Sequence, residues 1–280
     1  MRRRTLGALG VLLALGPLGA LSGCQLGGSA EDSGADKSSS STPTAPASSP
    51  ATRAPRPKPS TCYRLTFDAA IAPTTDTPKV SCKHGYTART FYVGVIDAVV
   101  RGHLLAVDSH WVRDQIATEC PRRLAKYLDG SREELRLTML RTVWFSPTIA
   151  ESDEGQDWFR CDVIALAGNQ RLSTLHGSVK SALSGDGDKY AMCGTDDPSS
   201  KDFERVICSR HHSWRAIATI DSSAAKYPGS SKLRSKGKAE CEGPARSVAD
   251  DPLNVTWSYE PPTKDQWRAG QHYGICWVPA

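Results

Sequence analysis

The sequence predicts an α+β fold made of two tandem, small, disulfide-stapled repeats, each a short antiparallel sheet with one helix. Three observations lead to this. The heptapeptide "GQDWFRC" at 155–161 returns as "GQHYGIC" at 270–276. The eight cysteines beyond residue 60 fall into two groups of four, spaced in a similar way. Each group also brackets strand-like runs on both sides of one helical run. Self-similarity of this kind is typical of a duplicated unit.

Residues 1–24 are interpreted as a lipoprotein signal peptide. Met1 is followed by three arginines and then by an apolar run that Gly and Pro interrupt, too short for a membrane span. The run ends in "LSGC", which resembles the lipobox of bacterial lipoproteins. That resemblance implies that Cys24 carries diacylglycerol and, once the signal is removed, an acyl chain such as palmitate. The alternative is an ordinary secretory signal that happens to contain a cysteine.

Residues 25–60 are rich in Ser, Thr, Pro and Ala and nearly devoid of apolar side chains, so we expect a disordered tether. The expected location is the extracytoplasmic face of the cell membrane, with the membrane itself as a partner through the lipid anchor. The formal net charge is +5, and it falls to about +2 once Arg2, Arg3 and Arg4 leave with the signal. Such a chain is not expected to bind nucleic acid.

The cysteine count agrees with export. Nine cysteines are an odd number, and assigning Cys24 to lipid leaves eight that an oxidising compartment would pair. With repeats at 61–178 and 179–280, a shared pairing scheme leaves three possibilities. We favour first with second and third with fourth, because the first two cysteines flank neighbouring strand-like runs. The predicted pairs are Cys62 with Cys82, Cys120 with Cys161, Cys193 with Cys208, and Cys241 with Cys276.

The elements of the first repeat follow from its hydrophobic periodicity. Residues 87–100 are rich in β-branched and aromatic side chains, as in a half-buried strand. Residues 108–130 predict a helix, with Asp108 or Ser109 as its cap and Cys120 on its apolar face. Pro121 should kink that helix or start a second segment. Two further strands are expected at 134–145 and 158–167.

The second repeat should contain the same elements in the same order. Strands are expected at 214–220, 253–259 and 272–278. The helix at 231–248 should be shorter and poorer, because it contains Gly237, Gly243 and Pro244. "WFSP" at 144–147 is aligned with "WSYEP" at 257–261. Residues 168–191 are expected to link the two repeats.

The sequence does not indicate chemistry that would make the protein an enzyme. His84, His211 and His212 lie near cysteines, but disulfides would consume the sulfurs, so we predict no metal and no cofactor. Nucleophile-elbow and zinc-protease motifs are missing from the sequence. We therefore name no catalytic residue. The alternative is an envelope enzyme acting on peptidoglycan or its precursors.

Aromatic residues near the closing cysteines are the candidate binding residues. Tyr and Trp suit surfaces that are half apolar, such as a shallow groove for peptide or glycan. Most of these aromatics are expected to be core or disulfide-packing residues. The second repeat concentrates them, and we expect it to contribute more of the recognition. The candidates are Trp257, Tyr259, Trp267 and Tyr273.

The same residues resemble the septum-formation family of exported actinobacterial proteins. The resemblance rests on cysteine, histidine, Trp-Pro and glycine positions: Cys62, Cys82, His84, Cys120, Trp144, Pro147, Gly155 and Cys161, and again Cys193, Cys208, His212, Cys241, Trp257, Pro261, Trp267, Gly270 and Cys276. "YPG" at 227–229 also matches. The first repeat departs from the pattern, since His84 follows Cys82 closely and "YPG" is missing there.

The resemblance implies an envelope or cell-division context, and it carries no catalytic residue. The expected function is that of a lipid-anchored, extracytoplasmic binding or scaffolding module. Envelope or division proteins, or peptidoglycan, would be its partners.

Overall fold

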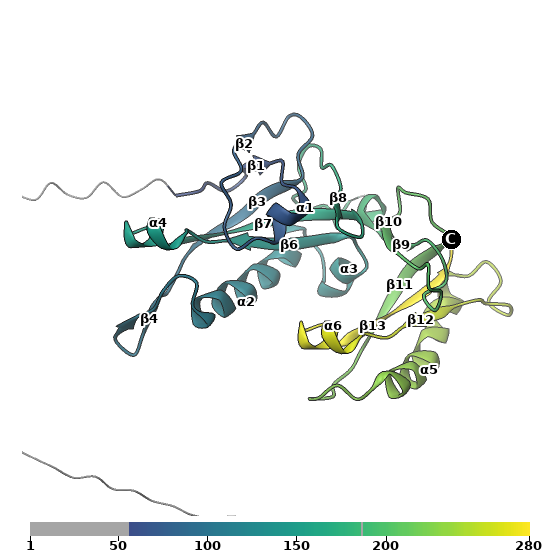
Figure 1. Ribbon diagram of the computed structural model, residues 1–280. Helices are drawn as coiled ribbons and strands as arrows, with labels where there is room; N and C mark the ends of the chain where they lie inside the picture. The colour runs from purple at the N-terminus through teal and green to yellow at the C-terminus, as the bar shows by residue number, and fades with distance from the viewer. Residues whose placement is uncertain (1–55, 186) are drawn as a thin grey trace, which may run out of the picture. The chain divides into compact units, whose positions relative to one another are not determined.

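A computed structural model of the chain describes residues 56–185 and 187–280 (Figure 1). The predicted signal peptide, Cys24 and residues 25–55 of the predicted tether lie outside the described residues. The described part of Ala51–Ala280 is one compact unit. Within it, no helix has both the length and the apolar character that crossing a membrane requires.

Folded structure begins before the predicted boundary at residue 61. The Arg56 side chain forms an ion pair with Asp157, and the Ser60 N–H donates to the Thr90 carbonyl at 2.7 Å. The last five residues that the sequence assigns to the tether therefore contact the folded body.

The first repeat is built on an antiparallel sheet with the strand order β2-β1-β3-β7-β6, and β8 pairs with β7. A short hairpin, β4–β5, stands apart from this sheet. The strands are β1 (Cys62–Tyr63), β2 (Lys79–Val80), β3 (Ala88–Val95), β4 (Val99–Val100), β5 (His103–Leu104), β6 (Leu140–Phe145), β7 (Trp158–Gly168) and β8 (Arg171–Leu172).

The second repeat has an antiparallel sheet with the equivalent order, β10-β9-β11-β13-β12. Its strands are β9 (Met192–Gly194), β10 (Arg205–Ile207), β11 (Trp214–Asp221), β12 (Ser258–Glu260) and β13 (Tyr273–Pro279). In both sheets the long strand after the second cysteine lies between the strand of the first cysteine and the strand that carries the fourth cysteine. The predicted fold class, two α+β repeats with antiparallel sheets, is confirmed.

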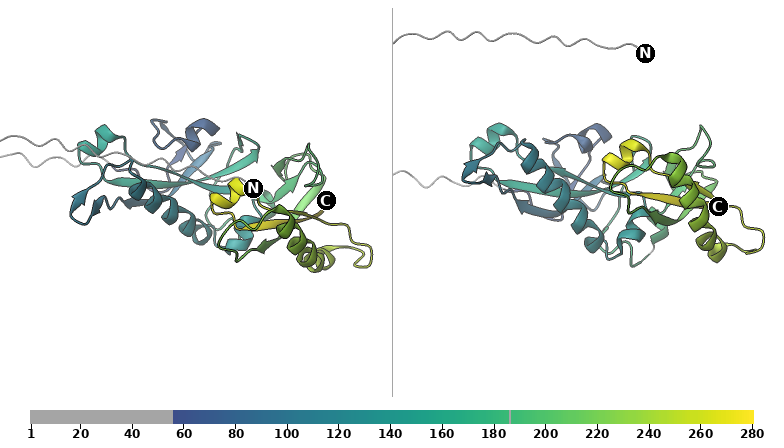
Figure 2. Two further views of the ribbon diagram at one scale, coloured as in Figure 1. Left: turned by 60° about the horizontal axis from the view of Figure 1, so that its bottom comes forward. Right: turned by 90° about the horizontal axis from the view of Figure 1, so that it is seen from below.

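One long helix packs on each sheet (Figure 2). These are α2 (His110–Tyr127) and α5 (Ser230–Val248). Their buried positions fall eight and four residues before the helix cysteine, at the cysteine, and four residues after it. They are Val112, Ile116, Cys120 and Leu124 in α2, and Leu233, Gly237, Cys241 and Ala245 in α5. The short helices are α1 (Phe67–Ile71), α3 (Arg132–Arg136), α4 (Ile149–Asp153), α6 (Lys264–Arg268) and the 3₁₀ turn Gly187–Tyr190.

Four disulfides join the pairs that the sequence predicts. Cys62–Cys82 and Cys193–Cys208 each tie a strand, β1 or β9, to a cysteine just after the neighbouring edge strand, and Cys120–Cys161 and Cys241–Cys276 tie the long helices to β7 and β13. On the chain-entropy model, each closed loop contributes about 3 to 4 kcal/mol.

α2 continues through Pro121, and no second segment starts there. The prediction of a shorter helix in the second repeat is wrong, because α5 is 19 residues long although it contains Gly237, Gly243 and Pro244. Burial of one helix face against the sheet and the disulfide to β7 or β13 outweigh the weak intrinsic helix propensity. Gly237 also has a packing role, because a Cβ there would lie 2.2 Å from the Tyr259 ring.

Three strand predictions are too long. The strand expected at 87–100 ends at Val95, and Val99–Val100 form the separate strand β4. Residues 132–136 form α3, whose capping box joins the Ser131 hydroxyl to the Glu134 N–H at 3.0 Å and the Glu134 carboxylate to the Ser131 N–H at 2.6 Å. In the second repeat β12 begins only at Ser258. The register also corrects an alignment: Trp144 lies opposite Cys161, and Tyr259 lies opposite Cys276. Trp144 therefore corresponds to Tyr259, not to Trp257.

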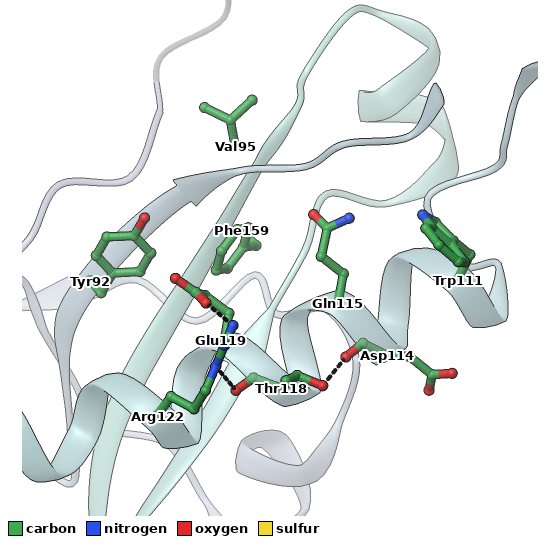
Figure 3. Close-up of a pocket in the computed structure, with 9 residues that line it drawn as sticks. All are labelled: Tyr92, Val95, Trp111, Asp114, Gln115, Thr118, Glu119, Arg122 and Phe159. Carbon is green, nitrogen blue, oxygen red and sulfur yellow. Dashed lines mark hydrogen bonds and ion pairs between the residues drawn. The ribbon is translucent and has the colours of Figure 1, made fainter. Parts of the chain in front are cut away.

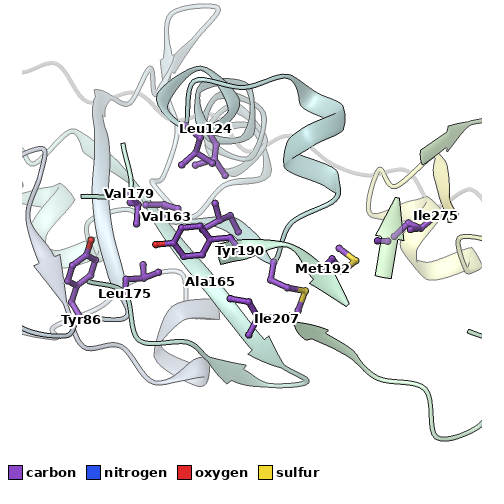
Figure 4. Packing of buried hydrophobic residues seen from close by; sticks show 14 of the residues in the cluster. Tyr86, Leu124, Val163, Ala165, Leu175, Val179, Tyr190, Met192, Ile207 and Ile275 are labelled. Atoms are coloured by element: carbon purple, nitrogen blue, oxygen red, sulfur yellow. The ribbon is translucent and has the colours of Figure 1, made fainter. Parts of the chain in front are cut away.

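A single hydrophobic cluster includes residues of both repeats (Figure 4). Leu140 and Val163 from the first sheet belong to it together with Met192, Ile207 and Trp277 from the second. The predicted linker belongs to this body too, since it buries side chains such as Leu175 and Val179. The backbone continues the contact, because the Met192 N–H donates to the Leu137 carbonyl at 2.8 Å. The repeats thus share a core.

A candidate binding groove where the repeats meet

The four candidate aromatics of the second repeat have different environments. Trp257 is half-buried and packs beside the Cys241–Cys276 disulfide. Tyr259 is buried, with its ring over Gly237 and Gly274. Burial, followed by the charges of Glu240 and Glu260, raises the pKa of Tyr259 to about 12.

Trp267 lies on α6 and is only 6% exposed. Its ring stacks on His272 with 4.3 Å between centroids and meets the Tyr227 ring edge-on at 5.8 Å. Buried rings of this kind offer no contact area to a partner. Trp267 and Tyr259 are therefore core residues, and the prediction that they bind a partner is corrected. Trp267 lies in a helix because Thr263 and Gln266 form a capping box that starts α6 at this point.

Tyr273, the fourth candidate, is half-buried and lines a groove of about 1200 Å³. One wall comes from the second half of α2, from α3 and from β6, and the other is the 269–273 segment between α6 and β13. The residues that shape its centre are Leu135, Leu140, Thr142, Trp144, Gln271 and Tyr273. Trp144 and Tyr273 give the groove an aromatic character, one from each repeat.

Cationic side chains outnumber carboxylates in the lining of the groove, although Arg122 and Arg136 are paired with Glu119 and Asp221. Five cationic side chains line it, against one carboxylate, that of Asp129. The cations are Arg122, Lys126, Arg132, Arg136 and Arg141. A concave wall lined by charges of one sign attracts ligands of the opposite sign.

Arg136 joins the two repeats across the groove. Its guanidinium donates to the Asp221 carboxylate at 2.8 Å and lies 3.9 Å above the centre of the Tyr273 ring. The Arg136 side chain is largely shielded from solvent, whereas Asp221 is exposed. The stack holds Tyr273 in place at one wall of the groove.

Arg141 is the cation of the groove whose pKa burial lowers. It donates to the Thr138 and Leu140 carbonyls at 2.7 and 2.6 Å, and within residues 56–185 and 187–280 it forms no ion pair. An anion beside it would offset the cost of that burial, because charge-assisted hydrogen bonds are stronger than bonds to neutral carbonyls.

Sequence reasoning missed the arginines of the groove. Arg132, Arg136 and Arg141 are spread over α3 and β6, whereas the sequence predicts a single strand over 134–145. The signal that could have shown the helix is Ser131 followed three residues later by Glu134, which places Arg132 and Arg136 one turn apart.

The histidines do not come together as metal ligands. Over the part of the chain that the structure describes, no group of three or more His, Cys, Asp or Glu side chains is arranged to hold a metal ion. His212 instead forms a local hydrogen bond, with 2.7 Å between its Nδ1 and the Arg210 carbonyl.

The fold and the site together define a class: a two-repeat, disulfide-stapled α+β protein with a cationic, aromatic groove where its repeats meet. A family model described as septum formation matches residues 139–276, from the start of β6 to the closing cysteine. These residues belong to the septum-formation family, as the cysteine and Trp-Pro pattern predicts. Searches of the curated proteins and of the solved structures each found no match.

The family match covers β6 and the 269–273 segment of the groove, whereas α2 and α3 precede it. A septum-formation domain connects the chain with cell division or the cell envelope. The four disulfides and this domain indicate an extracytoplasmic protein.

Proposed function

We propose that the protein is a lipid-anchored binding module on the extracytoplasmic face of the cell membrane, and that its groove binds peptidoglycan without transforming it. The observation that carries this proposal is the composition of the groove, with five cations against one carboxylate and an aromatic residue from each repeat. Peptidoglycan offers sugar rings that stack on aromatic side chains and stem-peptide carboxylates that pair with arginine.

The alternative, an envelope enzyme acting on peptidoglycan or its precursors, needs a general acid and a general base or nucleophile close together. Asp129 is the single carboxylate that lines the groove, and none of the described lining residues is a histidine. This composition supports binding over hydrolysis. Scaffolding of division proteins would use the same anchored body, but the groove favours a ligand with carboxylates.

The lipid anchor is tested at Cys24. Cys24→Ser is expected to block lipid attachment and signal cleavage in cells, because lipobox processing requires the thioether at that sulfur. Mass spectrometry should find a heavier precursor without acyl chains. A processed Cys24→Ser protein that partitions into detergent as the parent does would contradict the anchor.

The ligand is tested by crosslinking in intact cells from a photoreactive residue in place of Gln271, which lines the groove. We expect covalent attachment to glycan-containing fragments that lysozyme digestion shortens. The matched control carries the same photoreactive residue in place of Lys238, an exposed position on α5. Equal capture from both positions, or capture of protein alone, would contradict peptidoglycan as the ligand.

A further inference from the structure

The first repeat exposes an unusual set of large apolar side chains. They come from the end of β3, the β4–β5 hairpin and the first turns of α2 and α4. The exposed fractions are 54% for Val95, 57% for Val99, 80% for Leu104, 55% for Trp111 and 54% for Ile149. Contiguous exposed apolar surface on a folded protein marks an interaction site.

The β4–β5 hairpin, α4 and the start of α2 lie at one end of the first repeat (Figure 1). Val95 and Trp111 line a hollow of about 580 Å³ between β3 and α2 (Figure 3). Leu104 and Ile149 line a second hollow, of about 500 Å³, between the hairpin and α4. Val99 is the direct cross-strand partner of Leu104. We call this set of five residues the apolar face.

Hydrogen bonds hold the elements of the apolar face together. The Gln115 side chain on α2 accepts from the Asp97 N–H and donates to the Asp97 carbonyl, both at 3.1 Å. The Ile96 N–H donates to the Asp157 carbonyl at 2.7 Å, which ties the end of β3 to the segment after α4. The elements that carry the apolar face are therefore held in a defined arrangement by hydrogen bonds.

The residues of the apolar face can be compared with the residues at the equivalent positions of the second repeat. The cross-strand partners of Val95 and Asp221 both lie three residues before the closing cysteine, so these two positions correspond. Trp111 and Lys232 both lie nine residues before the helix cysteine, and Ile149 and Lys264 both begin the short helix after a capping threonine.

Three apolar residues of the first repeat thus occupy positions that are charged and exposed in the second. The fold itself does not require apolar side chains there. The hairpin that carries Val99 and Leu104 is also specific to the first repeat, because β3 and α2 are joined by residues 96–109, whereas β11 and α5 are joined by 222–229. Both differences point to a contact that the first repeat alone makes.

We propose that the apolar face docks on the outer surface of the lipid bilayer that holds the protein's anchor, an inference that rests on the lipid anchor proposed above. The described chain begins at Arg56, which forms an ion pair with Asp157 beside the face. The chain that leads back to Cys24 therefore leaves the body next to the apolar face, which can reach the bilayer without the body turning over.

The residue types of the face suit a membrane surface. Tryptophan and aliphatic side chains enter the boundary between headgroups and acyl chains, and arginine can extend its charge to the headgroups. Arg101 at the hairpin turn is exposed nearby, and so are Asp97 and Asp114. Because the charges around the face are mixed, the contact depends on apolar burial and should persist in high salt. Tethering raises the local concentration of bilayer, so a weak contact suffices.

The test uses the processed, lipidated protein reconstituted into phosphatidylcholine–phosphatidylglycerol vesicles whose phosphatidylcholine carries brominated acyl chains. Bromine quenches tryptophan only at short range, so the parent should lose emission equivalent to about one of its seven tryptophans. Trp111→Phe should lose most of this quenching. The double variant Val95→Asp and Ile149→Lys keeps Trp111 but takes the charged residues of the second repeat, and it should also lose the quenching.

Leu253→Lys is the matched control, because Leu253 is an 85% exposed apolar residue of the second repeat, and its quenching should equal that of the parent. Vesicle-bound parent without quenching would overturn the docking while leaving the anchor intact. Protein that fails to enter the membrane fraction would instead refute the anchor. Unquenched parent whose Trp111 peptides crosslink to a second copy would show a self-association surface, and would also overturn the proposal.

Discussion

At the scale of single residues, the most unusual feature is a buried ion pair in the first sheet. Asp162 is fully buried, accepts from the Thr90 hydroxyl at 2.7 Å and lies 3.3 Å from Arg160 Nε. The Arg160 guanidinium lies 3.8 Å above the centre of the Tyr63 ring. The second repeat has Trp277 at the position of Asp162 and Ile275 at that of Arg160. The same sheet site thus accepts a charged pair or an apolar pair.

Asp162 should make stability depend on pH. Burial raises its pKa to about 6, although Arg160 and Thr90 oppose the shift. The pKa of Asp162 in the folded protein exceeds the ordinary value of 3.8 in the unfolded chain, so the folded state binds the proton more tightly. The contribution of this proton to the free energy of unfolding is therefore full below about pH 4 and is lost as pH rises through 6. The full loss should be on the order of 3 kcal/mol, of which about 2 kcal/mol falls between pH 4.5 and 7.5. Denaturant unfolding at pH 4.5 and 7.5, compared with Asp162→Asn, measures it. Equal pH dependence in the two proteins would contradict the assignment.

Trp267 provides a second residue-scale prediction. Since its ring is buried between Tyr227 and His272, Trp267→Ala should lower the free energy of unfolding by about 3 to 5 kcal/mol. Thermal melting measures this, and Arg268→Ala, at an exposed neighbour on the same helix, should change stability little. A Trp267→Ala protein that melts with the parent would contradict the core assignment.

At the scale of elements, the sequence predicts the existence of a helix better than its length. The spacing of four between apolar residues places Cys120 on the buried face of α2, as the structure has it. Pro121 suggests a second segment in α2, and the glycines and Pro244 suggest a short α5, but each helix is long and continuous because tertiary packing outweighs local propensity. The short helices α4 and α6 were missed, although each begins with a capping threonine followed three residues later by Glu or Gln.

Two glycines of α5 should respond in opposite ways to alanine. A Cβ at Gly237 would meet the Tyr259 ring, so Gly237→Ala should destabilise the protein by about 1 to 3 kcal/mol despite its better helix propensity. Gly243 faces open space, and Gly243→Ala should stabilise by up to about 1 kcal/mol. Chemical denaturation of both variants compares packing with propensity in one helix. If both changes stabilised the protein, the Tyr259 ring would not exclude a Cβ at Gly237, and the prediction would be wrong.

At the scale of the whole molecule, the sequence predicts the two repeats and the cysteine pairs, but not the groove. The repeats can be recognised because their cysteines and short motifs recur in the same order along the chain. The groove depends on how the repeats dock, through buried residues such as Leu140, Met192 and Trp277, and no local pattern encodes that contact. For the same reason, Tyr273 could be proposed from its residue type, whereas Arg136 and Arg141 became visible only in three dimensions.

The central claim is that this cationic, aromatic groove holds peptidoglycan without cleaving it. Sedimentation of the purified protein with isolated sacculi, with soluble muropeptides measured in the supernatant, tests both halves of that claim. We expect saturable binding that weakens with salt, falls about tenfold in Arg141→Gln, is unchanged in Arg234→Gln at an exposed site on α5, and releases no muropeptides. Equal binding by the parent and Arg141→Gln, or steady release of muropeptides by the parent, would contradict the account.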